Sequence, residues 1–449
     1  MLKNRLLLVV LHLLCGFFLT LSFIPKLVAI LVMFYAIVDI TKSKNDNHQA
    51  FLWASYFVSA EVLLRMTGGT ISWEMVKYVT IIFLSIGILV ERQSREFPVL
   101  FWLYILLLLL GISFSEIPAG ESLRKAIVFN LSGPITLGVS AMYFYRRVVD
   151  YHRFKEILFF SLLPILSMLT LLYFRAPSLK ELTFGSSANF VASGGFGPNQ
   201  VSTALGFGLF LFATLLLLRG KITGFIYIDI FLLFYLTYRG LLTFSRGGML
   251  TGFLAFVLFS IFYLIGKHKL VSLFKYLGIM SLFFLTIWLY SSNVTGGRLS
   301  NRYLGKDYMG VQNKDITTGR LAIMRDQLNA FLEHPFFGLG VGSGKYSRLD
   351  EYDQTITIVS HNEITRLLEE HGLIGLFSLL LLFYAVMDNF RQQDIRYKGF
   401  VLGFATLWFL TISHSAMRIA FPGFVYGLSL IRFYDSEDKE DDHLIPLAE

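Results

Sequence analysis

The chain has 449 residues, of which 55% are hydrophobic and 16% are charged. A soluble globular protein has a lower apolar share and a higher charged share, so this composition excludes a soluble protein and predicts a polytopic membrane protein. The net charge of +8 is expected to reflect cytoplasmic loops rather than nucleic-acid binding, and the single cysteine, Cys15, excludes an internal disulfide.

Apolar segments long enough to cross roughly 30 Å of hydrocarbon recur along nearly the whole chain. They predict an all-α integral membrane protein, a bundle of 12–14 transmembrane helices with one long periplasmic loop that contains an amphipathic helix. The predicted spans are 6–23, 27–40, 49–65, 74–90, 97–113, 126–145, 157–174, 199–218, 222–238, 248–265, 272–291, 364–388, 398–413 and 416–433. Twelve spans remain an alternative to fourteen, because the second segment is short and the ninth and tenth flank a turn.

The spans and loops divide the chain into five parts. These are N-terminal helices (1–198), core helices (199–291), a catalytic loop (292–360), C-terminal helices (361–434) and an acidic tail (435–449). Loops on one side of the bundle hold roughly twice as many Lys and Arg residues as loops on the other side, and such an excess marks the cytoplasmic side. Both termini are therefore predicted in the cytoplasm, and the 292–360 loop is predicted on the outer face.

An amphipathic helix is predicted within this loop. Its apolar residues form one helical stripe, which stops at His334 and Pro335; the stripe consists of Leu321, Met324, Leu328, Phe331 and Leu332. A helix of this kind is expected to lie on the membrane surface or against the bundle. Glycines then follow at every second position from Gly338 to Gly344, a spacing that suits either close backbone approach to a ligand or a flexible turn.

Ser360-His361-Asn362-Glu363 matches a capping box, with Ser360 as the N-cap and Glu363 at the third helical position. His361 would then lie in the first turn, where the helix dipole lowers its pKa and keeps the imidazole neutral. A neutral imidazole at a membrane boundary can accept a proton from a sugar hydroxyl. The other interpretation is a loop histidine that is simply hydrated, and periodicity alone favours it.

Arg320 would occupy the first turn of the loop helix, where the dipole disfavours a cation by roughly 0.3–1 kcal/mol. An anionic partner is therefore expected. Helix N–H groups with an arginine fork suit a diphosphate, whereas a salt bridge to Asp315 or contact with lipid headgroups is the alternative. Arg246, with Arg239 at the same level, lies at a span boundary. It could line a polar cavity at a broken helix or anchor the helix at the interface.

Three further residues complete the candidate substrate-binding set with Arg239: Asn199, Asn362 and Arg325. Asn199 begins a span on the same face, and helix capping is its alternative role. Neither an Asp-x-Asp pair nor a His/Cys cluster occurs in the loop, so neither a metal nor another cofactor is expected.

Five short motifs follow one another in a characteristic order. They are Ser245-Arg246-Gly247, Thr318-Gly319-Arg320, His334-Pro335 with Gly338-Leu339-Gly340, Ser360-His361-Asn362, and Glu370-His371-Gly372. From about Asn199 to Gly375 the chain thereby resembles the O-antigen ligase and O-antigen polymerase family of bacterial membrane proteins.

The resemblance implies a metal-independent, inverting glycosyl transfer from an undecaprenyl-diphosphate-linked glycan at the periplasmic face of the inner membrane. It implies His361 as the base and Arg246 and Arg320 as the diphosphate ligands. The predicted function is a polysaccharide polymerase, because fourteen spans exceed the twelve associated with ligases. The expected partners are the lipid-linked donor, a glycan acceptor, membrane lipid and a chain-length regulator.

Three alternatives remain open. Two share the donor and differ in the acceptor: a ligase that transfers glycan to lipid A core, and a protein O-oligosaccharyltransferase. A lipid-linked glycan flippase or transporter belongs to another class, which typically shows related halves and charges near the middle of the membrane. No such internal repeat is visible in the sequence.

Overall fold

The computed structural model describes residues 4–21, 23–92, 96–175, 188–307, 309–313, 317, 319–348 and 359–434, without the side chain of Leu270. The predicted acidic tail 435–449, together with Asp315 and Thr318, lies outside the described residues.

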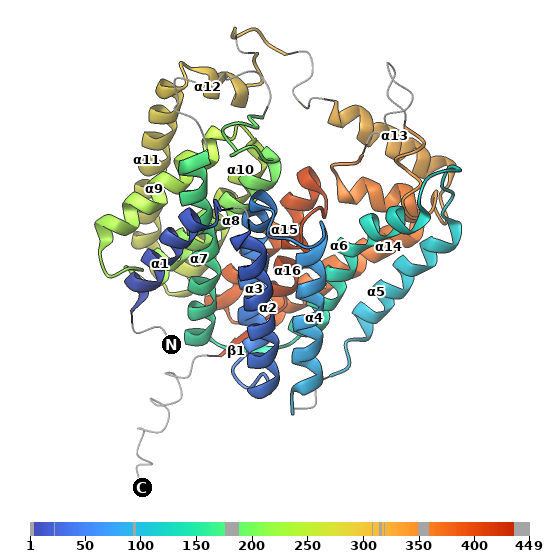
Figure 1. The fold of residues 1–449 in the computed structure, drawn as a ribbon, viewed down its shortest axis with the longest axis horizontal. Helices are drawn as coiled ribbons and strands as arrows, with labels where there is room; N and C mark the ends of the chain where they lie inside the picture. Colours follow the sequence, from blue (N-terminus) through green and yellow to red (C-terminus); the bar gives the residue numbers. More distant parts are fainter. Residues whose placement is uncertain are drawn as a thin grey trace.

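The fold is helical almost throughout, which confirms the predicted all-α class (Figure 1). The long helices are α1 (Arg5–Phe18), α2 (Ile24–Lys42), α3 (Gln49–Thr67), α4 (Met75–Val90), α5 (Val99–Leu110, continued by the 3-10 turn η1, Gly111–Phe114), α6 (Leu123–Phe144), α7 (Tyr151–Arg175), α8 (Pro198–Arg219), α9 (Ile226–Leu242), α10 (Arg246–Gly266), α11 (Leu270–Val294), α14 (Glu363–Gln392) and α15 (Ile395–Ser415). Each corresponds, in chain order, to one predicted span.

Within the described residues, eight helices are long and apolar enough to cross a membrane, and three apolar helices are shorter. The prediction of a continuous span over 416–433 is wrong. α15 ends at Ser415, the backbone turns at Ala416 (φ 51°), and α16 (Phe421–Leu428) has 8 residues. Hydropathy detected the apolar character of this stretch, but it could not detect the turn that divides it.

Three helices pack closely and position the functional site: α8, α10 and α15. Glycines allow α8 and α10 to meet backbone to backbone, since a Cβ on Gly252 would lie 2.0 Å from the carbonyl oxygen of Gly206. Small residues allow the same close approach in other membrane helix pairs. The Ser202 hydroxyl also donates to the Ser245 carbonyl (2.8 Å), so the start of α10 is fixed against α8.

Two helices of the long loop lie at one end of the bundle, α12 (Arg298–Tyr303) and α13 (Arg320–Glu333) (Figure 1). At the opposite end, β1 (Val148–Asp150) and β2 (Arg432–Tyr434) form a parallel pair with Val148 opposite Arg432. This short pair is a small departure from the all-α prediction. It ties the α6–α7 connection to the segment that follows α16.

The predicted amphipathic helix is α13, and its apolar stripe is only partly packed against the bundle. Met324 is half-buried, and its sulfur lies 3.7 Å from the side-chain amide of Asn362. Leu332, at the other end of the stripe, is 72% exposed, whereas the fully buried residue of α13 is the polar Gln327. The Gln327 amide donates to Glu369 of α14 (2.8 Å). α13 therefore docks through Gln327 and Met324, and it leaves Leu332 on the outside, where a membrane surface can cover it.

The alternating glycines pack against protein backbone, a contact that neither sequence interpretation anticipated. Gly338, Gly340 and Gly342 have positive φ, and a Cβ on Gly340 would lie 2.2 Å from the backbone of Phe114. The Leu339 amide donates to the Glu369 carbonyl (2.9 Å). Only glycine adopts these conformations at such short range without strain, so the run is a tightly packed segment rather than a flexible turn.

Candidate active site at the loop end of the bundle

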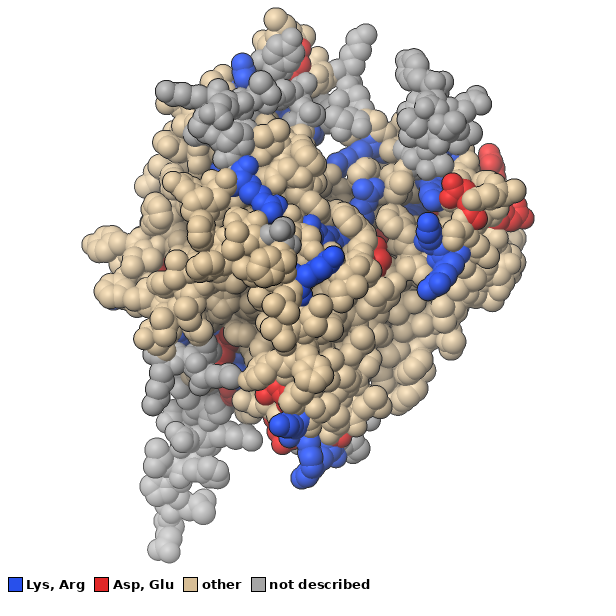
Figure 2. Space-filling view, viewed as in Figure 1, with Lys and Arg blue, Asp and Glu red and all other residues tan. Residues whose placement is uncertain are grey.

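A cavity of about 300 Å³ lies where the long loop meets the helix ends. Its walls are Asn199, Ser245, Arg246, Gly247, Arg302, Thr317, Arg320, Leu321, Ile323, Met324, Gln327, His361, Asn362, Ser413 and His414. These residues come from α8, α10, α12, α13 and α15 and from the segment that precedes α14. On the face shown in Figure 2, Lys and Arg side chains gather around a hollow at the same end of the molecule as α12 and α13.

A sharp turn between α9 and α10 places Arg246 in the cavity. Phe244, just before it, has φ of 55°, a left-handed conformation that is strained for a bulky residue and that recurs at functional sites. Arg302 holds this turn through its Nε, which donates to the Phe244 carbonyl (3.4 Å). Arg246 Nη1 in turn donates to the Arg302 carbonyl (3.4 Å), so the two arginines lie side by side.

Three helices direct their N-terminal ends at the cavity, as shown by the lining residues Asn199 in α8, Arg246 in α10 and Arg320 in α13. The N-cap residues of the three helices make no side-chain hydrogen bond to the first turn, although in α13 the Leu321 amide donates to the Thr317 hydroxyl (3.2 Å). The first N–H groups of a helix lack partners within the helix and carry partial positive charge. Three such ends on one cavity favour an anion there.

The charged side chains add to this positive field. Arg246, Arg302 and Arg320 line the cavity, and among its described lining residues there is no carboxylate. Burial lowers the pKa of Arg302, and repulsion from Arg246 and Arg320 lowers it further. The pKa of Arg320 is lowered by burial and then by Arg246. Repulsion among half-buried cations is relieved when an anion binds between them, so the cavity is suited to a phosphate or diphosphate.

His361 lies in the cavity, but the predicted capping box is wrong. The N-cap of α14 is Asn362, whose side-chain oxygen accepts from the amides of Ile364 (2.9 Å) and Thr365 (3.3 Å). His361 precedes the cap and is outside the helix. Glu363 pairs with Arg366 instead of reaching back to Ser360. An asparagine caps a helix as well as a serine, and the sequence alone did not distinguish the two registers.

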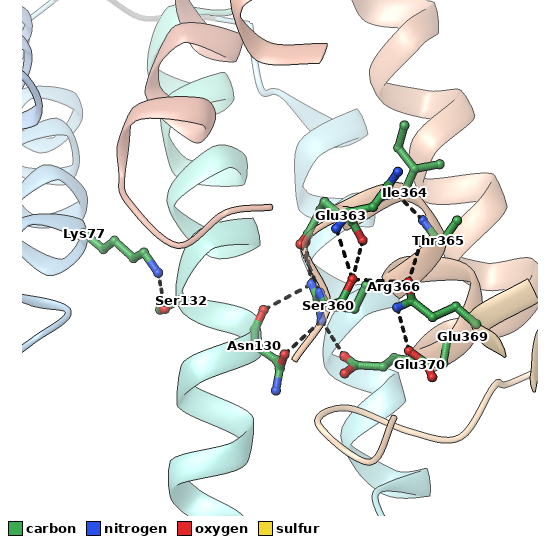
Figure 3. A network of polar contacts seen from close by, with 12 residues as sticks. Lys77, Asn130, Ser132, Ser360, Glu363, Ile364, Thr365, Arg366, Glu369 and Glu370 are labelled. Atoms are coloured by element: carbon green, nitrogen blue, oxygen red, sulfur yellow. Dashed lines mark hydrogen bonds and ion pairs between the residues drawn. The ribbon is translucent and has the colours of Figure 1, made fainter. Parts of the chain in front are cut away.

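Polar contacts on both sides hold the backbone at His361. The Arg418 guanidinium donates to the Ser360 carbonyl (3.0 Å), and the Ser360 hydroxyl donates to Gln327 Oε1 (3.2 Å). Close to Ser360, Arg366 forms ion pairs with Glu363 and Glu370 (Figure 3). Buried charges that are fully paired fix a single arrangement of the chain around them.

The pKa of His361 is lowered to about 4, first by burial and then by Arg418, Arg320 and His414. The direction agrees with the prediction, but the cause differs, because burial and neighbouring cations replace the helix dipole. The imidazole is consequently neutral at physiological pH. An anion bound to Arg320 would offset part of the positive field and raise this pKa toward neutrality.

The structure brings together five of the seven candidate residues: His361, Arg246, Arg320, Asn199 and Asn362. Asn199 Oδ1 accepts from the Ser245 hydroxyl (2.8 Å) and so supports the turn before Arg246.

The other two candidates lie apart from the cavity. Arg239 is buried, and its guanidinium donates to the carbonyls of Leu172 (3.2 Å) and Ala192 (3.1 Å). Arg325 is exposed on α13 and does not line the cavity. Their substrate-binding roles stay predictions, and the location of these two residues outside the cavity does not support them.

Sequence reasoning missed four residues that build the site: Arg302, Gln327, His414 and Arg418. Residues of these types are common at such positions: cations in loops and at span ends, amides in amphipathic helices, and histidines at span ends. None of the four therefore indicated a functional role by itself. The N-terminal helices also contribute. Arg65 of α3 pairs with Glu61 (2.6 Å) and donates to the Arg418 carbonyl (3.2 Å).

Fold and site together define a multi-pass membrane protein with a cationic cavity and a neutral histidine at the loop end of its helix bundle. Residues 230–380 match the family model described as O-antigen ligase. This stretch of the chain is therefore similar to O-antigen ligases, which confirms the resemblance of the motifs, and together with the apolar helices it indicates a multi-pass bacterial membrane protein. Comparison with curated proteins and with solved structures found no match.

Proposed function

We propose that the protein is a membrane glycosyltransferase that moves a glycan from an undecaprenyl-diphosphate-linked donor to a hydroxyl of an acceptor sugar, as an O-antigen or surface polysaccharide polymerase. The observation that carries the proposal is the cavity itself. It joins three arginines and three helix N-termini to a neutral imidazole, without a carboxylate among its described lining residues. Such a cavity combines a site for an anionic leaving group with a base.

The reaction follows from these groups. His361 accepts the proton of the acceptor hydroxyl while the oxygen of that hydroxyl attacks the anomeric carbon of the donor sugar. The new C–O bond forms as the bond to the diphosphate breaks, and the lipid diphosphate leaves with the electron pair. Arg246, Arg302 and Arg320 stabilise the charge that develops on the diphosphate. Attack opposite the leaving group inverts the anomeric centre.

Donor binding also prepares the base. A pKa of about 4, caused by burial and then by Arg418, Arg320 and His414, makes His361 a weak base before the donor binds. The negative charge of the diphosphate offsets these cations and raises the pKa, and a base is most effective when its pKa is near the working pH. Proton transfer is thereby favoured after the donor is in place.

The location and orientation belong to the same proposal. We place the protein in the bacterial inner membrane, with the cavity on the periplasmic face and both termini in the cytoplasm. The excess of Lys and Arg in the cytoplasmic set of loops supports this orientation. A lipid-linked donor could then enter from the membrane, with its diphosphate at the level of the helix N-termini.

A deletion strain complemented with wild type or with His361→Ala tests the function, with surface glycan separated on a gel. A polymerase predicts that the His361→Ala strain makes core carrying one repeat unit and no long chains. Core without any repeat unit would indicate a ligase that acts on lipid A core. Normal long chains would refute His361 as the base. The control is His268→Asn, which changes an exposed histidine just after the opposite end of α10, where asparagine tolerates the positive φ.

Arg320→Lys tests the diphosphate contact. Lysine keeps the positive charge but loses the planar fork that binds two oxygens at once, so transfer from purified donor should be impaired. Arg298→Lys is the matched control, because Arg298 likewise begins a loop helix but is exposed and does not line the cavity. Full activity of Arg320→Lys would contradict a bidentate contact.

A further inference from the structure

A second imidazole lies in the cavity and has no role in the proposed reaction. His414 is next to the last residue of α15 and lines the same cavity as Arg246, Arg320 and His361. It is outside the residues matched by the family model, 230–380. Its hydrogen bonds fix which way the ring presents its two nitrogens.

The Nδ1 atom of His414 lies 2.6 Å from the carbonyl oxygen of Leu410, one turn earlier in α15. A carbonyl oxygen can only accept a hydrogen bond, so Nδ1 must carry a proton and donate. In the neutral ring Nε2 then carries a lone pair and acts as an acceptor. The helix itself selects this tautomer.

The Nε2 atom is buried and has no hydrogen-bond partner among the described residues. Buried polar atoms in native proteins nearly always have partners, and an exception at a functional cavity indicates a ligand that completes it. A group that donates a hydrogen bond from within the cavity would satisfy this nitrogen.

His414 lies beside two of the three proposed diphosphate ligands, Arg246 and Arg320. A Cβ on Gly247 would come within 2.3 Å of His414 Cδ2 and 2.7 Å of Nε2, so the ring packs on the backbone next to Arg246. Arg320 Nη1 donates to the carbonyl oxygen of His414 (3.2 Å). A substrate group that reaches Nε2 is therefore close to the diphosphate.

The amide side chains of the cavity do not offer an equivalent acceptor. Asn199 Oδ1 accepts from the Ser245 hydroxyl, Gln327 Oε1 accepts from two hydroxyls, and Asn362 Oδ1 caps α14. The arginines are donors only. A sugar bound here brings O–H and N–H groups that need acceptors, and His414 supplies one.

We propose that His414 Nε2 accepts a hydrogen bond from an O–H or N–H group of the donor's reducing-end sugar, the sugar joined to the diphosphate. The inference rests on the proposed function, because the arginines place the diphosphate and the diphosphate places this sugar. His414 makes and breaks no covalent bond. It recognises the donor sugar, whereas His361 acts on the acceptor hydroxyl.

Two substitutions of His414 distinguish the roles of its two ring nitrogens. His414→Asn keeps an amide near the Nδ1 position that can donate to Leu410 but leaves nothing at Nε2, whereas His414→Gln extends an amide to the Nε2 position. The assay uses full-length protein in nanodiscs and lipid-linked repeat units extracted from the deletion strain. It measures the KM for this donor and the inhibition constant of undecaprenyl diphosphate, which has no sugar.

One missing hydrogen bond predicts a donor KM raised roughly 3- to 10-fold in His414→Asn, with a smaller rise in His414→Gln. The inhibition constant of undecaprenyl diphosphate should not change. His268→Asn, a control at an exposed turn where asparagine tolerates the positive φ, should leave both constants unchanged.

An unchanged donor KM in His414→Asn would overturn the inference. So would an inhibition constant that rises in step with the KM, since that result would show that the ring supports the arginines rather than the sugar. If His414→Asn does not fold, His414→Gln allows the same comparison of the two constants. A wild-type protein that transfers no glycan from this donor would instead refute the proposed function, which keeps the two failures distinct.

Discussion

The contact between α8 and α10 controls the geometry of the site, and Gly252→Ala perturbs it directly. The new Cβ would lie 2.0 Å from the Gly206 carbonyl oxygen, although real Cβ atoms essentially never approach within 3.0 Å. The two helices must therefore separate by at least 1.0 Å, the difference between these distances. α8 carries Asn199 and α10 carries Arg246, so the separation displaces two residues that line the cavity relative to each other.

The expected magnitudes follow from this displacement. Overpacking costs about 1–3 kcal/mol, and the better helix propensity of alanine offsets roughly 0.5–1 kcal/mol, leaving a net loss of about 0–2.5 kcal/mol. A misplacement of about 1 Å in a catalytic site can reduce the rate by about 100-fold. The assay is transfer from purified donor, with thermal unfolding in the same detergent. Activity should fall far more than stability.

Gly278→Ala is the matched control, because it makes the same chemical change in the middle of α11, where no atom lies within 4 Å of the new Cβ. It should raise helix stability by roughly 0.5–1 kcal/mol and leave transfer unchanged. If Gly252→Ala also retained wild-type activity and unfolding temperature, the close helix contact would not position the site, and the reasoning would be refuted.

Three other predictions concern charge. Glu61→Gln removes the buried partner of Arg65, and breaking a buried ion pair costs about 3–5 kcal/mol, so the free energy of unfolding should fall by about 3 kcal/mol in a denaturation experiment. Glu333→Gln is the exposed control, and an equal stability of the two variants would contradict this prediction. His361 has a pKa of about 4, so the neutral base is lost only on acidification, and kcat/KM should be flat from about pH 6 to 8 and fall below about pH 5. Arg320→Gln removes a cation that lowers this pKa, so in this variant the fall of kcat/KM at low pH should begin at a higher pH. A fall at the same pH as in the wild type would show that Arg320 does not act on His361.

Local patterns in the sequence determined much of the fold. Apolar runs located thirteen helices of the described residues in order, because hydrocarbon requires each span to satisfy its own backbone hydrogen bonds. The stripe that begins at Leu321 and the stop at His334 likewise located α13. These features depend on neighbours within one or two turns, and such neighbours are visible in a sequence.

The sequence also identified the chemical groups of the site. Arg246, Arg320 and His361 were selected from motifs, and they share one cavity. The prediction of Ser360 as the N-cap of α14 was wrong. Ser360 and Asn362 are both suitable N-cap residues, and contacts of Ser360 with Gln327 and Arg418 decide which of them caps the helix.

Only the tertiary structure decided which other groups join these residues. His414 meets Arg320 across a sequence separation of 94 residues, and Arg65 reaches Arg418 across 353. The low pKa of His361 arises from burial and from cations on other elements, so no local pattern contains it. Periodicity specifies which face of a helix is apolar. The partner of each polar side chain depends on how the helices pack, because close packing brings together residues that are far apart along the chain.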